Sequence, residues 1–169
     1  MTIQIRRERP ADVPAIRAVN VAAFRTAAEA DLVEALRAEA MPLVSLVADA
    51  GGEVVGHIMF SPVTVAGRAS PSMMGLAPMA VVPARQREGI GSALVREGLA
   101  VCRELGAGAV VVLGHAAFYP RFGFTAASRF GLSCEYDVPD DVFMAMELDS
   151  GSLRGTSGTI RYHPAFANV

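Results

Sequence analysis

The stretch Leu76–Leu105, LAPMAVVPARQREGIGSALVREGLAVCREL, organises the rest of this 169-residue chain. It begins as an apolar strand, turns through residues 86–91 (QREGIG) and continues as an amphipathic helix. Gly89 and Gly91 stand at the entrance of that helix, where a backbone without Cβ atoms can come close to a ligand. The first helical turn offers unpaired N–H groups and the positive end of the helix dipole, and Ser92 adds a hydroxyl. The stretch therefore predicts a cradle for a phosphorylated cofactor.

Spacing limits which phosphate loop this turn can be. The dinucleotide fingerprint G-x-G-x-x-G needs a third glycine at position 94, where the chain has Leu94. A Walker loop needs a Gly-Lys pair, and the chain contains no lysine. An ordinary strand–loop–helix corner, with glycines for tight packing, remains an alternative on these six residues alone.

Composition bounds the class of protein. The length suits one domain with a real core, and 52% hydrophobic against 19% charged residues argues against disorder. No apolar run reaches the roughly 18 residues that span a bilayer, so no membrane partner is expected. The N-terminal residues carry charges without an apolar signal region, so we expect a cytoplasmic protein.

Charge and cysteine content exclude further classes. A formal charge of −2 gives no global attraction to nucleic acid. The two cysteines, Cys102 and Cys134, form neither a disulfide framework nor a metal knuckle. The three histidines show no metal-ligand spacing with acidic residues or cysteine, so no metal is expected.

The residues before the central stretch predict two helices and an antiparallel meander. A first strand covers residues 3–6, a helix opened by Pro10 carries an apolar face, and a second helix covers residues 28–40. The face of the first helix consists of Ile16, Val19 and Phe24. Strands are expected at 43–50 and 53–65 around a Gly51-Gly52 hairpin turn, followed by a turn at 66–72.

Pro78 lies inside the strand that leads to the cofactor turn. Proline cannot donate a ladder hydrogen bond, so it predicts a bulge or a splayed edge where a neighbouring strand parts from this one. Such a gap would leave backbone groups of this strand free to pair with an extended ligand. A harmless proline at an unpaired ladder position is the alternative.

The residues after the turn predict a crossover helix and further strands. The helix from Gly89 is expected to place Ile90, Leu94, Val101 and Leu105 on one face. A buried, parallel strand at 109–113 and a short helical turn within 114–124 follow. The remaining strands are expected at 130–136, 142–148 and near 159–162.

Several of these segments together resemble the GNAT N-acetyltransferase superfamily and, within it, the YhbS-like predicted acetyltransferases. The resemblance covers nearly the full chain. Its segments are Gly56–Val63, Leu76–Val81, the Q-x-x-G-x-G of Gln86–Gly91, Val112–Gly114, Tyr119–Phe124 and the tail Tyr162–Phe166. It implies an α/β (α+β) fold, namely a mixed, mostly antiparallel twisted central sheet flanked by helices and splayed between its fourth and fifth strands. Residues 1–169 would form a single acetyl-CoA-dependent N-acetyltransferase domain.

The resemblance also implies roles for individual residues. The cofactor-binding residues would be Met79, Ala80, Val81, Gln86, Arg87, Glu88, Gly89, Ile90, Gly91 and Ser92. The first three would offer backbone groups to the pantetheine and the acetyl carbonyl, and the others would hold the pyrophosphate. Tyr119 would protonate the departing thiolate, although a core aromatic beside Phe118 is the alternative. The branch usually has glycine where Ala77 stands and an acidic residue where His115 stands.

Acetyl transfer from acetyl-CoA needs a neutral amine and a proton for the sulfur. A thiol has a pKa of about 8.5, and a phenol near about 10 can supply its proton. The strand region 72–82 contains no carboxylate to act as general base, so water relayed from His57, Ser61 or His115 remains open. His163 is expected to be structural.

The function expected from these parts is direct acetyl transfer to a primary amine of a small molecule, peptide or protein. A non-catalytic acyl-CoA-binding or sensing module is the rival interpretation, and a fold that binds another nucleotide is a third. Many relatives pair as homodimers, so the resemblance allows a homodimer here. The acceptor and the acyl-chain length stay open.

Overall fold

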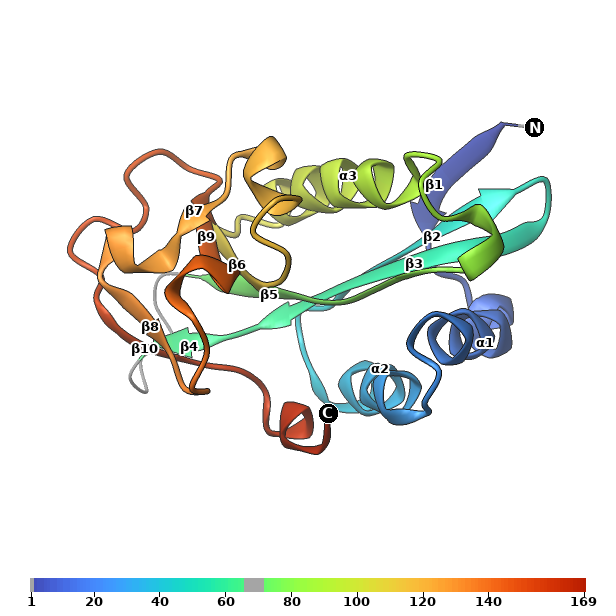
Figure 1. Cartoon of the computed structure of the whole chain (residues 1–169), viewed down its shortest axis with the longest axis horizontal. Coiled ribbons are helices and arrows are strands. Elements are labelled where there is room, and N and C mark those ends of the chain that lie inside the picture. Colours follow the sequence, from blue (N-terminus) through green and yellow to red (C-terminus); the bar gives the residue numbers. More distant parts are fainter. Residues whose placement is uncertain (1, 66–71) are drawn as a thin grey trace.

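The computed structural model describes residues 2–65 and 72–169, and a seven-stranded mixed sheet forms its centre (Figure 1). The strands lie in the order β1-β2-β3-β5-β6-β9-β7, and β5 with β6 is the parallel pair among antiparallel ones. Their bounds are β1 Ile3–Arg7, β2 Val44–Ala50, β3 Glu53–Pro62, β5 Met73–Val81, β6 Ala109–Leu113, β7 Thr125–Ala126 and β9 Phe143–Glu147. The mixed, mostly antiparallel sheet predicted from the sequence is confirmed.

A second, three-stranded sheet has the order β4-β10-β8. It consists of β4 (Thr64–Val65), β10 (Gly158–Arg161) and β8 (Leu132–Cys134). The strand predicted at 53–65 therefore serves two sheets, because the backbone leaves β3 after Pro62 and resumes at β4. Residues 132–134 pair with β10, which was not foreseen. The turn predicted at 66–72 lies almost wholly at 66–71, outside the described residues.

Three α-helices of the described residues cover the central sheet: α1 (Val13–Phe24), α2 (Ala28–Glu39) and α3 (Ile90–Glu104). Figure 1 shows α3 on one face and α1, α2 and the C-terminal turn on the other. Side-chain alternation along β3 explains the two layers, because Ile58 and Phe60 pack with α3 while Met59 packs with α1 and α2. Short 3-10 segments are Pro10–Asp12, Pro83–Arg85, Tyr119–Phe122, Ala127–Phe130, Asp140–Val142 and Pro164–Asn168. No helix among the described residues is long and apolar enough to span a membrane.

The buried face of α3 differs in one position from its prediction. Ile90, Leu94 and Val101 are buried, but Leu105 is 48% exposed. The helix ends at Glu104, and Gly106 turns the chain away in a left-handed conformation (φ +86°), so Leu105 no longer faces the sheet. The helix packs closely against β3 at Gly98, where an added Cβ would lie 2.3 Å from Phe60 Cε1.

The sheet splays between β5 and β6, as predicted from Pro78. Pairing of these strands runs from Met73–Ala109 to Leu76–Val112 and stops, whereas β5 continues to Val81. On its other side, β5 carries one additional residue opposite Met59, because the register with β3 shifts there. The bulge and the end of the β5–β6 pairing both lie beside Pro78, as the missing N–H of proline predicts. Among the described residues, no strand pairs with the β6-facing edge of β5 beyond Leu76.

Candidate functional site

A cavity of about 1090 Å³ lies where β5 and β6 part. Its lining comes from both faces of the sheet: the start of α3 on one side, and the α1–α2 region with the C-terminal turn on the other. The cavity therefore passes through the sheet at the splay. Its volume lies slightly above the range of about 300–1000 Å³ for small-molecule sites, which suits a site for two substrates.

The turn before α3 forms one end of this cavity. Arg87 (φ +66°) and Gly89 (φ +84°) adopt left-handed conformations that curl the backbone around the helix entrance. Gln86 Nε2 donates to the Val81 carbonyl at 3.0 Å and ties the turn to β5. The first turn of α3 receives no hydrogen bond from a capping side chain. Its amide groups and the helix dipole are therefore arranged for an anion.

The ladder between β3 and β5 decides which backbone groups face the splay. Val82 N donates to Val55 O at 2.9 Å, and hydrogen-bonded and non-hydrogen-bonded pairs alternate in an antiparallel ladder. Ala80, opposite His57, is thus the residue whose backbone groups bond to β3. Met79 and Val81 direct theirs toward the open edge, where an extended ligand can pair with them.

Most of the predicted cofactor-binding residues line the cavity. Those that do are Met79, Val81, Gln86, Arg87, Gly89, Ile90, Gly91 and Ser92. Ala80 and Glu88 do not line it. Ala80 is buried in the sheet, and Glu88 forms an ion pair with Arg85, whose Nε lies 3.0 Å from Glu88 Oε1. Ala77, which stands where the branch has glycine, lines the cavity.

Tyr119 lines the cavity from the 3-10 segment after β6. Its ring packs edge-on against Phe118 at 5.0 Å and Phe124 at 5.7 Å between centroids. Burial raises the pKa of Tyr119 from 10.0 to about 12, so the phenol stays protonated at neutral pH. The residue is thus a packed aromatic whose protonated phenol lies beside the splay.

Only one of the three proton-relay candidates reaches the cavity among the described residues. His115 is exposed and lines it. Ser61 and His57 are fully buried and do not line it. His163 is structural, as predicted, because its Nδ1 accepts a hydrogen bond from Ala165 N at 3.0 Å.

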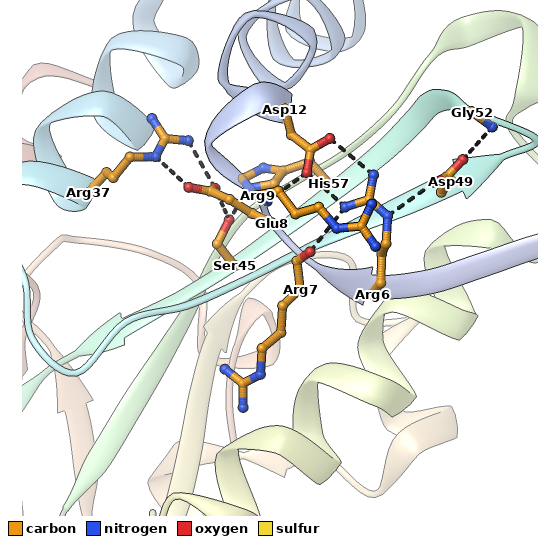
Figure 2. A network of polar contacts seen from close by, with 10 residues as sticks. All are labelled: Arg6, Arg7, Glu8, Arg9, Asp12, Arg37, Ser45, Asp49, Gly52 and His57. Carbon is orange, nitrogen blue, oxygen red and sulfur yellow. Dashed lines mark hydrogen bonds and ion pairs between the residues drawn. The ribbon is translucent and has the colours of Figure 1, made fainter.

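His57 belongs instead to a partly buried polar network (Figure 2). Its Nε2 lies 2.9 Å from Ser45 Oγ, and Ser45 donates its proton to Glu8, which Arg37 holds through two hydrogen bonds. Ser45 must therefore accept from His57, and His57 Nδ1 accepts from Asn20 Nδ2 at 3.3 Å. Burial lowers the pKa of His57 to about 4, which keeps the ring neutral. Although burial alone would raise the pKa of Glu8, hydrogen bonds from Arg37 and Ser45 lower it.

Sequence reasoning missed two groups of lining residues. Arg85 and Arg121 join Arg87 at the α3 end of the cavity, and the Arg121 guanidinium lies 4.6 Å above the centre of the Phe118 ring. Aromatic and apolar side chains line the other end, namely Phe24, Leu32, Tyr136, Tyr162 and Phe166. Phe24 and Leu32 come from α1 and α2, and the other three from the segments that follow β8 and β10, so the group comes together only in the folded chain. Among residues 2–65 and 72–169, no three His, Cys, Asp or Glu side chains cluster as metal ligands.

Comparison with known proteins agrees with this arrangement. Residues 13–124 match the model of the acetyltransferase (GNAT) family. The chain is 39% identical over 163 residues to the uncharacterized N-acetyltransferase YhbS of Escherichia coli K12, which covers 96% of this chain and 97% of that protein. The crystal structure of E. coli YhbS in complex with CoA has a TM-score of 0.90 at 37% identity, over 98% of this chain and 92% of that one. A GNAT family acetyltransferase from Brucella melitensis in complex with acetyl-CoA has a TM-score of 0.80 at 41% identity, over 98% of both chains.

Proposed function

This chain belongs to the acetyltransferase (GNAT) family, and we propose that it transfers the acetyl group of acetyl-CoA directly to a primary amine. The observation that carries the proposal is the cavity itself, which crosses the sheet at the splay and has an uncapped helix N-terminus at one end. Relatives of similar sequence and fold hold CoA or acetyl-CoA. The chain is therefore an acyltransferase with acetyl-CoA as its cosubstrate.

The cofactor's phosphates fit the end of the cavity that α3 and the arginines form. The amides of Ile90, Gly91 and Ser92 begin the helix without a capping side chain, and a Cβ at Gly91 would point toward Met79 Cε at 3.5 Å. Gly91 therefore leaves room that the fold itself does not need. Arg85, Arg87 and Arg121 add positive charge around the same end.

The open edge of β5 fits the pantetheine arm and the acetyl carbonyl. Met79 and Val81 direct backbone groups to that edge, and the Val81 carbonyl already accepts from Gln86. An N–H of this edge that donates to the carbonyl oxygen would stabilise the negative charge that develops there. Ala80 has no such role, because its backbone groups bond to His57.

The reaction forms a bond between the amine nitrogen and the acetyl carbon and breaks the carbon–sulfur bond of the thioester. Tyr119 donates the proton that the departing sulfur takes up. A phenol with a pKa of about 12 is a weak acid toward a thiolate in water, but burial in the same cavity raises the thiol pKa as well. The amine loses its proton to His115 or to water beside it.

Turnover and binding together test this proposal. Acetyl-CoA and CoA should each raise the melting temperature, whereas ATP and NAD should not, because only a ligand bound to the folded state stabilises it. Addition of a panel of primary amines to the acetyl-CoA complex should release free thiol above the rate of hydrolysis. Stabilisation by acetyl-CoA without acetylation of any amine would favour a binding module. Absence of stabilisation at saturating acetyl-CoA would overturn the assignment of the cavity.

A further inference from the structure

The cavity has two ends of different chemistry. At the α3 end stand the cavity's three arginine side chains, Arg85, Arg87 and Arg121. At the α1–α2 end, on the opposite face of the sheet, stand aromatic and apolar side chains and one carboxylate, Glu29. The α3 end suits the phosphates of the cofactor, so the other end is left for the acceptor.

The aromatic wall at the acceptor end is held in place by several contacts. The Tyr162 ring occupies the space above Gly75, where an added Cβ would lie 2.8 Å from Tyr162 Cε1. Phe166 packs against the Tyr162 ring at 5.1 Å between centroids, and Tyr136 stacks on the same Tyr162 ring at 6.2 Å between centroids. The carboxylate of Glu135 accepts from Tyr162 N and thereby ties the end of β8 to the end of β10. The wall is therefore built before any acceptor binds.

Part of this wall remains exposed where it lines the cavity. Phe24 and Tyr136 are each 36% exposed although both belong to the cavity lining. When an apolar ligand covers exposed aromatic surface in a concave site, the binding free energy gains about 25 cal/mol for each Å² of apolar surface removed from water. The wall therefore favours an acceptor with an aromatic or bulky apolar body.

Glu29 places a negative charge at the acceptor end of the cavity. It is the only acidic side chain among the described residues that line the cavity. One carboxylate oxygen accepts from Thr26 Oγ1 at 3.1 Å, and no arginine of residues 2–65 and 72–169 forms an ion pair with it. A protonated amine is attracted to this end, whereas an acceptor that carries a carboxylate is disfavoured.

We propose that the acceptor is a small primary amine attached to an aromatic or bulky apolar group and lacking a carboxylate. This inference rests on the proposed function and deepens it. Tyr136, Tyr162 and Phe166 contact the body of the acceptor, and Glu29 draws its ammonium group to the mouth of the cavity before the proton is lost. Amines whose bodies are hydrophilic, such as aminosugars or polyamines, gain nothing from the wall.

Binding to the CoA-saturated protein tests the acceptor class without requiring turnover. Calorimetric titration should give 2-phenylethylamine at least about tenfold higher affinity than ethylamine, because burial of the ring adds apolar contact. Phenylalanine, which has the same ring and a carboxylate, should bind more weakly than 2-phenylethylamine. Equal or tighter binding of ethylamine, spermidine or glucosamine would overturn the inference.

Variants locate that binding in the wall. Phe166→Leu, with Phe166→Ala as the larger truncation, should lower the affinity for 2-phenylethylamine and leave that for CoA unchanged. Glu29→Gln should lower it several-fold, most clearly at low salt, while the matched control Glu53→Gln on the β2–β3 turn should not. If Phe166→Leu and Glu29→Gln both bind as the parent does, the wall is not the acceptor site.

The outcomes separate this inference from the proposed function. If spermidine or glucosamine is acetylated while 2-phenylethylamine neither binds nor reacts, the acceptor class is wrong and the acetyltransferase activity stands. If acetyl-CoA itself fails to bind, the proposed function is overturned. Titration of 2-phenylethylamine into the ligand-free protein then decides whether the wall still binds it.

Discussion

Gly114 and Tyr119 fit each other so closely that a Cβ on Gly114 would lie 2.2 Å from Tyr119 Cε2. Phe118 and Phe124 pack on other sides of the same ring, so the tyrosine has no space in which to withdraw. The glycine that follows β6 thus sets the position of the phenol beside the splay. The position of Tyr119, the proposed general acid, therefore depends on the lack of a side chain at Gly114.

Gly114→Ala should displace Tyr119. We expect a loss of about 1–3 kcal/mol in the free energy of unfolding, because the methyl group overpacks a rigid aromatic cluster, and a marked fall in turnover. Urea denaturation measures the first effect. In the Gly114→Ala/Tyr119→Ala double variant, the alanine at 114 should cost much less, since the ring that it meets is gone. Additive effects in that cycle would contradict the contact.

Tyr119→Phe should separate chemistry from cofactor binding. The ring packing survives, so the acetyl-CoA dissociation constant should stay within about twofold, while kcat falls by roughly 10²-fold as expected for loss of a general acid. Because the pKa of Tyr119 is about 12, the activity of the parent should show no loss from tyrosine ionisation up to pH 10. An unchanged kcat would leave Tyr119 as a packing residue.

Gly91→Ala should harm ligand binding and not the fold. The nearest atom to an added Cβ is Met79 Cε at 3.5 Å, an ordinary contact, and alanine favours the helix by up to about 1 kcal/mol over glycine. We expect equal or higher stability in the absence of ligand and at least about tenfold weaker binding of acetyl-CoA by calorimetry. Undiminished binding would place the phosphates away from the start of α3.

His57 should make the protein less stable in mild acid. Its pKa is lowered from 6.5 to about 4 by burial, so between these values the unfolded chain takes up a proton that the folded chain refuses. Stability should fall by about 3 kcal/mol as the pH drops from 6.5 to 4, and the loss from His57 should then level off. The lowered pKa of Glu8 adds a further loss at lower pH, as its carboxylate becomes protonated.

His57→Gln should flatten the first part of this curve. Chemical denaturation at several pH values measures how the free energy of unfolding changes with pH. Between pH 6.5 and 4 this slope should correspond to almost one fewer proton taken up on unfolding than in the parent. Glu8 and Arg37 remain in this variant, so the further loss of stability at lower pH should persist. A variant with the parent's slope between pH 6.5 and 4 would show that another group governs that range.

Much of the site could be predicted because its signals are local. A strand, a glycine turn and an amphipathic helix follow one another in Leu76–Leu105, and the cradle before α3 is made by that stretch alone. Pro78 predicts the splay for the same reason, since a missing N–H is a property of the residue itself. The Gly51-Gly52 turn likewise predicted β2 and β3, and the continuous apolar run at 109–113 predicted β6.

Other features depend on contacts between distant segments. Ala80 looks like its neighbours in sequence, and only the register with β3 turns its backbone away from the open edge. His57 resembled a relay candidate until the fold enclosed it between Ser45 and Asn20. Leu105 fits the helical period, but the helix ends one residue before it.

The amino-acid sequence by itself determined the cofactor cradle and the opening in the sheet, because each is built from backbone properties of consecutive residues. The tertiary structure alone decided the end of the cavity that we propose for the acceptor. There Phe24, Tyr136, Tyr162 and Phe166 come from different elements and converge only when β8 pairs with β10 and the C-terminal turn packs on α2. Side chains from several distant segments form this wall, so no local sequence pattern predicts it, because only tertiary packing brings them together.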